Sequence, residues 1–135
     1  LLQAGARRLF DSKAVPGRIV DVLAVRAEAL EASPQALAGL LAAYFQALGY
    51  LHQRPDDAAR RMTARLGLAP DAVMSSLKGL HLPDLAENHG WLEGDHCRLD
   101  QSAATLEQVM RAAHLLVRPV SLDGLSEPRF LPAGP

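Results

Sequence analysis

The chain has 135 residues, of which 49% are hydrophobic, 21% are charged and only 4% are aromatic. This composition is typical of one globular domain and excludes a disordered or low-complexity segment. Fourteen basic and fifteen acidic residues give a net charge of -1, without the dense basic cluster that nucleic acid or an anionic membrane surface requires. The single cysteine, Cys97, excludes an internal disulfide bond. We therefore expect a protein that does not bind nucleic acid.

The sequence contains neither a recognisable membrane span nor a recognisable secretion signal. Every apolar run is shorter than the roughly 18 residues that a membrane span requires, and no charged region followed by an apolar region stands at the start. The chain begins with Leu-Leu-Gln-Ala-Gly and not with methionine. We therefore expect a fragment or a processed product, with any targeting peptide upstream of residue 1.

Residues 1–26 are predicted to form a loop followed by one strand. Pro16 and Gly17 mark a turn, and residues 19–25 contain three valines and an isoleucine, which favours a strand buried on both faces. Asp21 interrupts this run, and an unpaired buried carboxylate strongly destabilises a fold. Asp21 therefore either pairs with an arginine or faces a ligand. The candidate partners are Arg7, Arg18 and Arg26.

Residues 27–118 are predicted to form a helical segment. Its clearest helix begins with Ser33 as N-cap and Pro34 as the first helical residue, and apolar side chains recur every three or four residues as far as Leu51. Two shorter helices are expected to follow, each with a proline near its start and a glycine at its end. They cover residues 55–67 and 69–79.

The second half of the helical segment is less regular. Residues 80–100 lose the helical periodicity and predict an ordered loop with one helical turn at residues 84–88. A last helix is expected over residues 102–117, with Ser102 as its N-cap and Pro119 after its end. Residues 119–135 predict a turn-rich tail on the surface, attached through Phe130 and Leu131.

Histidines near the only cysteine raise the question of a metal or catalytic site. Residues 81–97 contain every ligand type of a zinc site, but only His96 and Cys97 are close in sequence, and adjacent side chains on an extended chain point in opposite directions. Cys97 also lacks a glycine turn that would stabilise an oxyanion, and no phosphate-binding glycine loop is present. We therefore expect no metal, no cofactor and no enzyme activity.

Several short motifs occur in an order that resembles a known family. They are Asp11-Ser12 followed by Pro16-Gly17, the strand with Asp21, Ser33-Pro34, "RPDDAA" at residues 54–59, "GLHLPDLAEN" at residues 79–88 and "EPRFLP" at residues 127–132. In this order they resemble the later part of the nitrate/sulfonate/taurine-type substrate-binding proteins of ABC transporters, a group that includes binders of thiamine-pyrimidine precursors.

The resemblance implies a two-lobed receptor of the type 2 periplasmic-binding fold, in which each lobe is an α/β sandwich and the ligand is enclosed between the lobes. This chain is expected to be mostly α, with only one or two β-strands, and to form a helix-rich C-terminal fragment of that fold. Residues 1–135 would then form a single incomplete domain. Residues 19–25 would then be a hinge-type strand between lobes. Its unpaired edges would also allow a homo-oligomer to form by strand exchange.

The same resemblance implies a transport function. The complete protein would bind a small anionic or heteroaromatic solute in the periplasm or another extracytoplasmic space and deliver it to the membrane permease of an ABC transporter. Ser12, Gly17 and Asp21 would lie nearest the ligand, with the Ser12 hydroxyl and the Gly17 N–H facing an oxyanion. Since like charges repel, Asp21 would instead hold an arginine or accept from an amine-bearing ligand.

A second class of protein is a helical interaction or sensor domain that has this sequence but no role in transport. The two classes differ in what precedes residue 1. A receptor requires a secretory or lipoprotein signal and roughly 150 to 200 residues of α/β pattern upstream, whereas an interaction domain requires neither.

Overall fold

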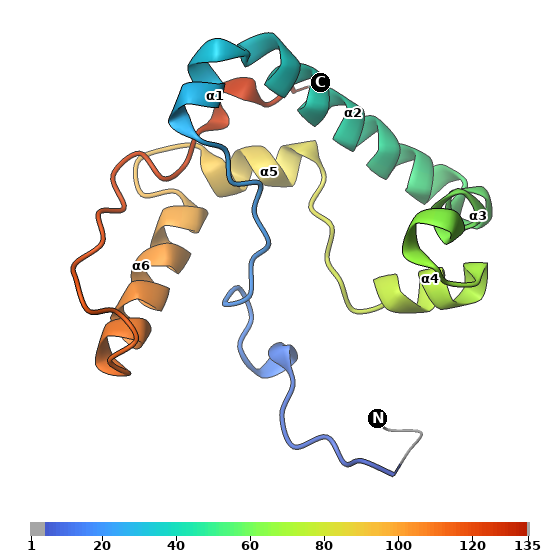
Figure 1. Ribbon diagram of the computed structural model, residues 1–135, viewed down its shortest axis with the longest axis horizontal. Helices are drawn as coiled ribbons and strands as arrows, with labels where there is room; N and C mark the ends of the chain where they lie inside the picture. Colours follow the sequence, from blue (N-terminus) through green and yellow to red (C-terminus); the bar gives the residue numbers. More distant parts are fainter. Residues whose placement is uncertain (1–4, 135) are drawn as a thin grey trace.

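A computed structural model describes residues 5–134 of the chain. Within this range the protein has six α-helices, two short 3-10 helices and no β-strand, so the mostly helical prediction is confirmed. Figure 1 shows an open arch, in which α2 forms one side, α3 and α4 fold back at its far end, and α6 forms the other side. The N-terminal segment leaves the arch between its two sides, and its first residues extend away from the helices.

Three helices start with a proline at their first position. They are α2 (Pro34–Gln53), α3 (Pro55–Leu66) and α4 (Pro70–Leu77). Proline suits this position because it has no N–H to leave unbonded and its φ is already helical. Gly67 ends α3 in the left-handed conformation, with a φ of 65°. These starts and this stop confirm the helices that the sequence predicts.

Ser33 has a different role from the one that the sequence predicts. Ser33 occupies the N-cap position of α2, but its side chain makes no capping hydrogen bond. Its backbone N–H instead donates to the carbonyl of Ala29 and ends a short helix, α1 (Ala27–Ala32). Pro34 alone therefore marks the start of α2.

The loop predicted over residues 80–100 contains a full helix, α5 (Leu85–Leu92), rather than a single turn. Asp84 and Glu87 form a capping box, in which each side chain accepts from the backbone N–H of the other residue. A capping box satisfies two N–H groups that would otherwise have no partner at the helix start. This local sequence signal was present at residues 84–87, and the prediction underestimated the helix that follows it.

The last helix, α6 (Arg98–Ala112), starts four residues earlier and ends five residues earlier than predicted. At its end the N–H of Leu115 donates to the carbonyl of Met110, and that of His114 donates to the carbonyl of Arg111. This pair of hydrogen bonds is a Schellman motif, with His114 in the left-handed region at a φ of 56°. The motif stops the helix before Leu115, whose side chain remains exposed.

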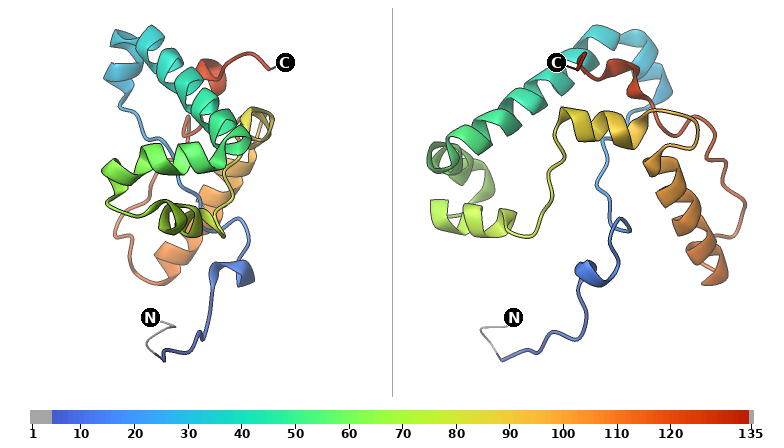
Figure 2. Two further views of the ribbon diagram at one scale, coloured as in Figure 1. Left: turned by 90° about the vertical axis from the view of Figure 1, so that its right-hand side faces the viewer. Right: turned by 180° about the vertical axis from the view of Figure 1, so that it is seen from behind.

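Four of the five buried hydrophobic side chains among the described residues lie where α2, α3 and α4 meet. Leu48 of α2, Ala58 and Ala59 of α3, and Val73 of α4 are all buried, and Val73 is fully enclosed. Two small alanines on α3 allow the neighbouring helices to approach closely. This junction is the core of the arch, and Figure 2 shows it from the side and from behind.

The strand predicted over residues 19–25 is wrong. Among the described residues this segment forms no backbone hydrogen bond and has no strand assignment, and Ile19 and Val22 are 71% and 61% exposed. A strand is stable only when a second strand satisfies its N–H and C=O groups. Residues 5–134 offer no such partner, so the apolar pattern alone does not produce a strand here.

The arch exposes far more surface than a compact protein of the same size. Its accessible surface is 10878 Å², whereas a compact monomer of this mass exposes about 6,900 Å². The exposed side chains include large apolar ones, such as Leu9, Leu106 and Val109. The helices therefore leave apolar faces uncovered along the arch.

The C-terminal tail returns from α6 to the first half of the arch. A 3-10 helix, η3 (Pro128–Phe130), packs against α2, and Phe130 and Leu131 are half-buried there, as predicted. None of the described helices is both long and apolar enough to cross a membrane.

Candidate functional site

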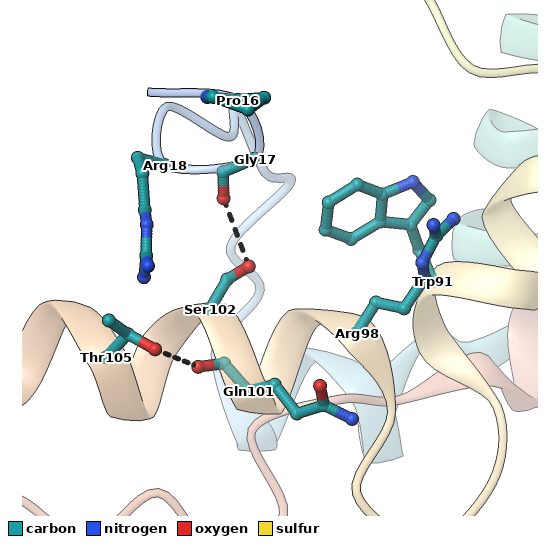
Figure 3. A pocket seen from close by; sticks show the side chains of 8 residues that line it. All are labelled: Pro16, Gly17, Arg18, Trp91, Arg98, Gln101, Ser102 and Thr105. Atoms are coloured by element: carbon teal, nitrogen blue, oxygen red, sulfur yellow. Dashed lines mark hydrogen bonds between the residues drawn. The ribbon is translucent and has the colours of Figure 1, made fainter. Parts of the chain in front are cut away.

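An open pocket of about 490 Å³ lies between the N-terminal segment and α6. Its walls come from the turn at residues 16–18, from the end of α5 and from the first two turns of α6 (Figure 3). The lining residues are Pro16, Gly17, Arg18, Trp91, Arg98, Gln101, Ser102 and Thr105. Residues that are 85 positions apart in the sequence therefore form one site.

Gly17 lines this pocket. Its carbonyl accepts a hydrogen bond from the Ser102 hydroxyl at 3.1 Å, as Figure 3 shows. Gly17 has a φ of 69°, which a residue with a side chain rarely adopts. Ser102 was expected to cap α6, and it lies instead in the second turn of the helix, where its hydroxyl holds the turn in place.

Two arginines give the pocket a positive charge. Neither Arg18 nor Arg98 forms an ion pair with any of residues 5–134, and no aspartate or glutamate lines the pocket. The Arg98 guanidinium lies 5.3 Å from the centre of the Trp91 ring, within the range of a cation–π contact. The ring therefore holds one of the two cations in position at the edge of the pocket.

The two side-chain hydroxyls and the side-chain amide of the pocket already donate hydrogen bonds to backbone carbonyls. The Thr105 hydroxyl donates to the carbonyl of Gln101, and the Gln101 side-chain amide donates to the carbonyl of His96. Ser102 donates to Gly17. The guanidinium groups of Arg18 and Arg98 are the charged donors that line the pocket, and a guanidinium binds carboxylate, sulfonate or phosphate oxygens through paired N–H groups.

The structure does not bring the three predicted ligand residues together. Ser12 starts the short 3-10 helix η2 (Ser12–Ala14) and, like Asp21, does not line the pocket. Asp21 is exposed and forms no ion pair or hydrogen bond within the described residues, so none of its candidate partners, Arg7, Arg18 and Arg26, pairs with it. Only Gly17 of the predicted set reaches the pocket.

His89 and Cys97 connect segments that are distant in the sequence. His89 contacts Glu93 through Nδ1 at 2.6 Å and the carbonyl of Pro132 through Nε2 at 3.0 Å, which attaches the tail to α5. Cys97 is buried, and its sulfur lies 3.0 Å from the Ser126 hydroxyl, which donates to Asp100. Across residues 5–134, no three histidine, cysteine or acidic side chains are grouped so that they could hold a metal ion.

The sequence analysis did not identify four of the pocket residues: Trp91, Arg98, Gln101 and Thr105. Residues 98, 101, 102 and 105 have the spacing of one helix face, so this face was readable in principle. Because the prediction began the helix at Ser102, it assigned Arg98 and Gln101 to the preceding loop. The four residues were therefore not recognised as one helix face. The contribution of Trp91 depends on how α5 and α6 pack, and no local signal predicts it.

Comparison of the chain with protein-family models, with curated proteins and with solved structures found no match.

Proposed function

We propose that this chain is the C-terminal part of an extracytoplasmic solute-binding protein that delivers a small anionic or heteroaromatic nutrient to the permease of an ABC transporter. The observation that carries the proposal is the pocket beside Gly17, where Arg18 and Arg98 have no acidic partner among the described residues. Charge-assisted hydrogen bonds from two guanidinium groups suit an oxyanion such as a sulfonate.

The segment at residues 19–25 supports the two-lobed α/β architecture. Its apolar side chains are partly to largely exposed, and its backbone forms no hydrogen bonds within the described chain. Continuous apolar runs of this kind occur in strands of parallel sheets that are covered by helices on both faces. In the proposed receptor, the neighbouring strands come from a part of the protein outside this chain.

The exposed apolar surface supports the same architecture. The arch exposes about 4,000 Å² more than a compact monomer of its mass, and α2 and α6 both contribute apolar side chains to that surface. In the proposed receptor the helices pack against the first lobe and cover these faces. The order of the motifs from Asp11-Ser12 to residues 127–132 is the sequence support for this assignment.

A thermal-shift screen of the protein against nitrate, taurine, other sulfonates and pyrimidines tests the proposal. A ligand at 100 times its Kd stabilises the folded state by about 2.7 kcal/mol, which raises the Tm of a domain of this size by several degrees. We expect such a shift from at least one of these compounds. If none of them raises the Tm, solute binding is contradicted.

The second candidate function is a helical interaction domain without a role in transport. The exposed apolar side chains of α6, such as Leu106 and Val109, favour it, because large uncovered apolar faces also mark protein-binding surfaces. Sequencing the gene upstream of residue 1 separates the two candidates. A secretory or lipoprotein signal followed by an α/β pattern supports the receptor, whereas a start codon near residue 1 supports the interaction domain.

A further inference from the structure

The pocket beside Gly17 contains an aromatic ring next to its two cations. We infer that it binds a planar aromatic or heteroaromatic ring that carries an oxyanion, such as an aromatic sulfonate or carboxylate, and that Trp91 and Arg98 together select it. This specificity rests on the proposed function, because it narrows the solutes that the receptor would take. The ligand is neither a bare anion nor a neutral ring, but a ring that carries an anionic group.

Trp91 and Pro16 supply the apolar part of the pocket. Trp91 is half-exposed at the end of α5, and Figure 3 shows its indole pointing toward the turn at residues 16–18. An aromatic ligand gains from offset stacking or edge contact with such a ring. A small inorganic anion cannot use this surface.

Arg98 lies directly beside that ring. Its guanidinium is 5.3 Å from the ring centre, so the cation and the aromatic ring are neighbours in the pocket. Figure 3 shows Arg18 on the opposite side of Ser102, along the same face of α6. A ligand with its ring against Trp91 and its anionic group between the arginines contacts the aromatic part and the cationic part of the pocket at the same time.

The size and openness of the pocket argue against a bare anion as the ligand. A volume of about 490 Å³ lies in the range of pockets for small organic molecules, and nitrate fills only a small part of it. Arg18 and Arg98 are both exposed, and an ion pair in water contributes little on its own. Contact between Trp91 and an aromatic ring of the ligand is therefore needed for tight binding. The two arginines then favour rings that carry an anionic group over neutral rings.

Trp91 is the only tryptophan of the chain, so its fluorescence reports directly on this pocket. Three matched probes separate the two parts of the recognition: benzenesulfonate has the ring and the charge, benzenesulfonamide has the ring without the charge, and methanesulfonate has the charge without the ring. We expect benzenesulfonate to quench Trp91 and to bind at least tenfold more tightly than either other probe, as measured by fluorescence titration and calorimetry.

Two substitutions test the assigned residues. Arg98→Gln should weaken benzenesulfonate binding at least tenfold and leave benzenesulfonamide binding unchanged, while Arg98→Lys should retain part of the affinity. Trp91→Leu should remove the advantage of benzenesulfonate over methanesulfonate in calorimetry. The matched control is Arg65→Gln, at an exposed arginine of α3 that does not line the pocket. Circular dichroism of each variant shows whether it folds.

The outcomes separate this specificity from the proposed function. Equal affinity for methanesulfonate and benzenesulfonate, or binding that Arg98→Gln does not change, overturns the specificity and leaves solute binding intact. If none of the three probes binds while a compound of the thermal-shift screen stabilises the protein, the pocket is wrong and the proposed function stands. If no compound of either set binds, both are overturned.

Discussion

The phenol of Tyr50 donates a hydrogen bond to the carboxylate of Asp57, which joins the last turn of α2 to the first turn of α3. The same carboxylate accepts from Arg61 at 2.7 Å and from Arg60 at 3.2 Å. The guanidinium groups of Arg54 and Arg61 lie 5.8 Å and 5.6 Å from the centre of the Tyr50 ring. Only Arg54 lies between the two helices, and the Tyr50–Asp57 hydrogen bond connects them across this corner. The cluster therefore stabilises the angle between α2 and α3.

Replacing the acid in this cluster should loosen the corner. We expect Asp57→Asn to lower the Tm by a few degrees, because the amide cannot pair with Arg61 as a charged acceptor, and thermal unfolding followed by circular dichroism measures the change. Asp56→Asn is the matched control, since Asp56 also lies in the first turn of α3 but forms no hydrogen bond among the described residues. An equal loss of Tm in both variants would assign the effect to the helix dipole.

The stability of the corner should depend on pH in the acid range. The hydrogen bond from Arg61, with those from Tyr50 and Arg60, lowers the pKa of Asp57 well below its ordinary value. Since the folded pKa is the lower one, this stabilisation is present above about pH 4 and is lost as the pH falls through the folded pKa. Urea unfolding at pH 6 and pH 3 should therefore show wild type and Asp57→Asn becoming more alike at the lower pH.

His89 should make the attachment of the tail depend on pH in the neutral range. Its hydrogen bond with Glu93, followed by that with the Pro132 carbonyl, raises its pKa, because both ring nitrogens face acceptors and only the imidazolium can donate to both. This stabilisation is fully present below the unfolded pKa of about 6.5 and is lost as the pH rises through the folded pKa. Limited proteolysis should cleave the tail faster at pH 8.5 than at pH 5.5.

The control for His89 is a second histidine without such contacts. His89→Gln should remove the pH dependence of tail cleavage, whereas His52→Gln, at an exposed position in the last turn of α2, should retain it. A pH dependence that survives His89→Gln would place the titrating group elsewhere.

The junction of α2, α3 and α4 should carry most of the packing energy of the arch. Val73 is fully enclosed, so Val73→Ala removes buried methyl groups and leaves a cavity, and we expect a loss of about 2 kcal/mol in the free energy of unfolding. The matched control, Val109→Ala, changes a side chain that is 59% exposed and should cost less than about 0.5 kcal/mol. Urea denaturation measures both, and equal losses would contradict this assignment of the core.

The end of α6 contains a residue that glycine should replace with a gain in stability. His114 adopts a φ of 56° in the Schellman motif, where a side chain costs roughly 1 kcal/mol relative to glycine. We therefore expect His114→Gly to raise the Tm by a few degrees in thermal unfolding. His52→Gly should lower it, because His52 lies in a regular helix where glycine is unfavourable. A lower Tm for His114→Gly would show that its side chain stabilises the fold.

The segment at residues 19–25 should cause association of the isolated chain at high concentration. Its free backbone edges and exposed apolar side chains allow pairing with a second copy. Light scattering after size-exclusion chromatography should show a mass that increases with concentration, and Val22→Lys should reduce the increase because a charge disfavours edge pairing. Val109→Lys, on an exposed face of α6, is the matched control, and an equal effect of both substitutions would point to general hydrophobic association instead.

Helix starts and stops were predictable because they depend on residues within one turn of each other. Pro34, Pro55 and Pro70 mark the first positions of three helices, and Gly67 marks an end. The position of α6 was not predictable in the same way. Ser102 has the chemistry of an N-cap, but its hydroxyl contacts the carbonyl of Gly17, and this contact depends on the packing of a distant segment.

The sequence by itself determined that the chain is mostly helical, where its proline-led helices begin, and that Gly17 lies in a turn. These features follow from fixed φ values and from hydrogen bonds within a few residues. Only the tertiary structure decided that residues 19–25 remain without a partner and that Arg98 and Trp91 join Gly17 in one pocket. Strand pairing and pocket walls require contacts between residues far apart in the chain, and no local pattern specifies which distant segment supplies them.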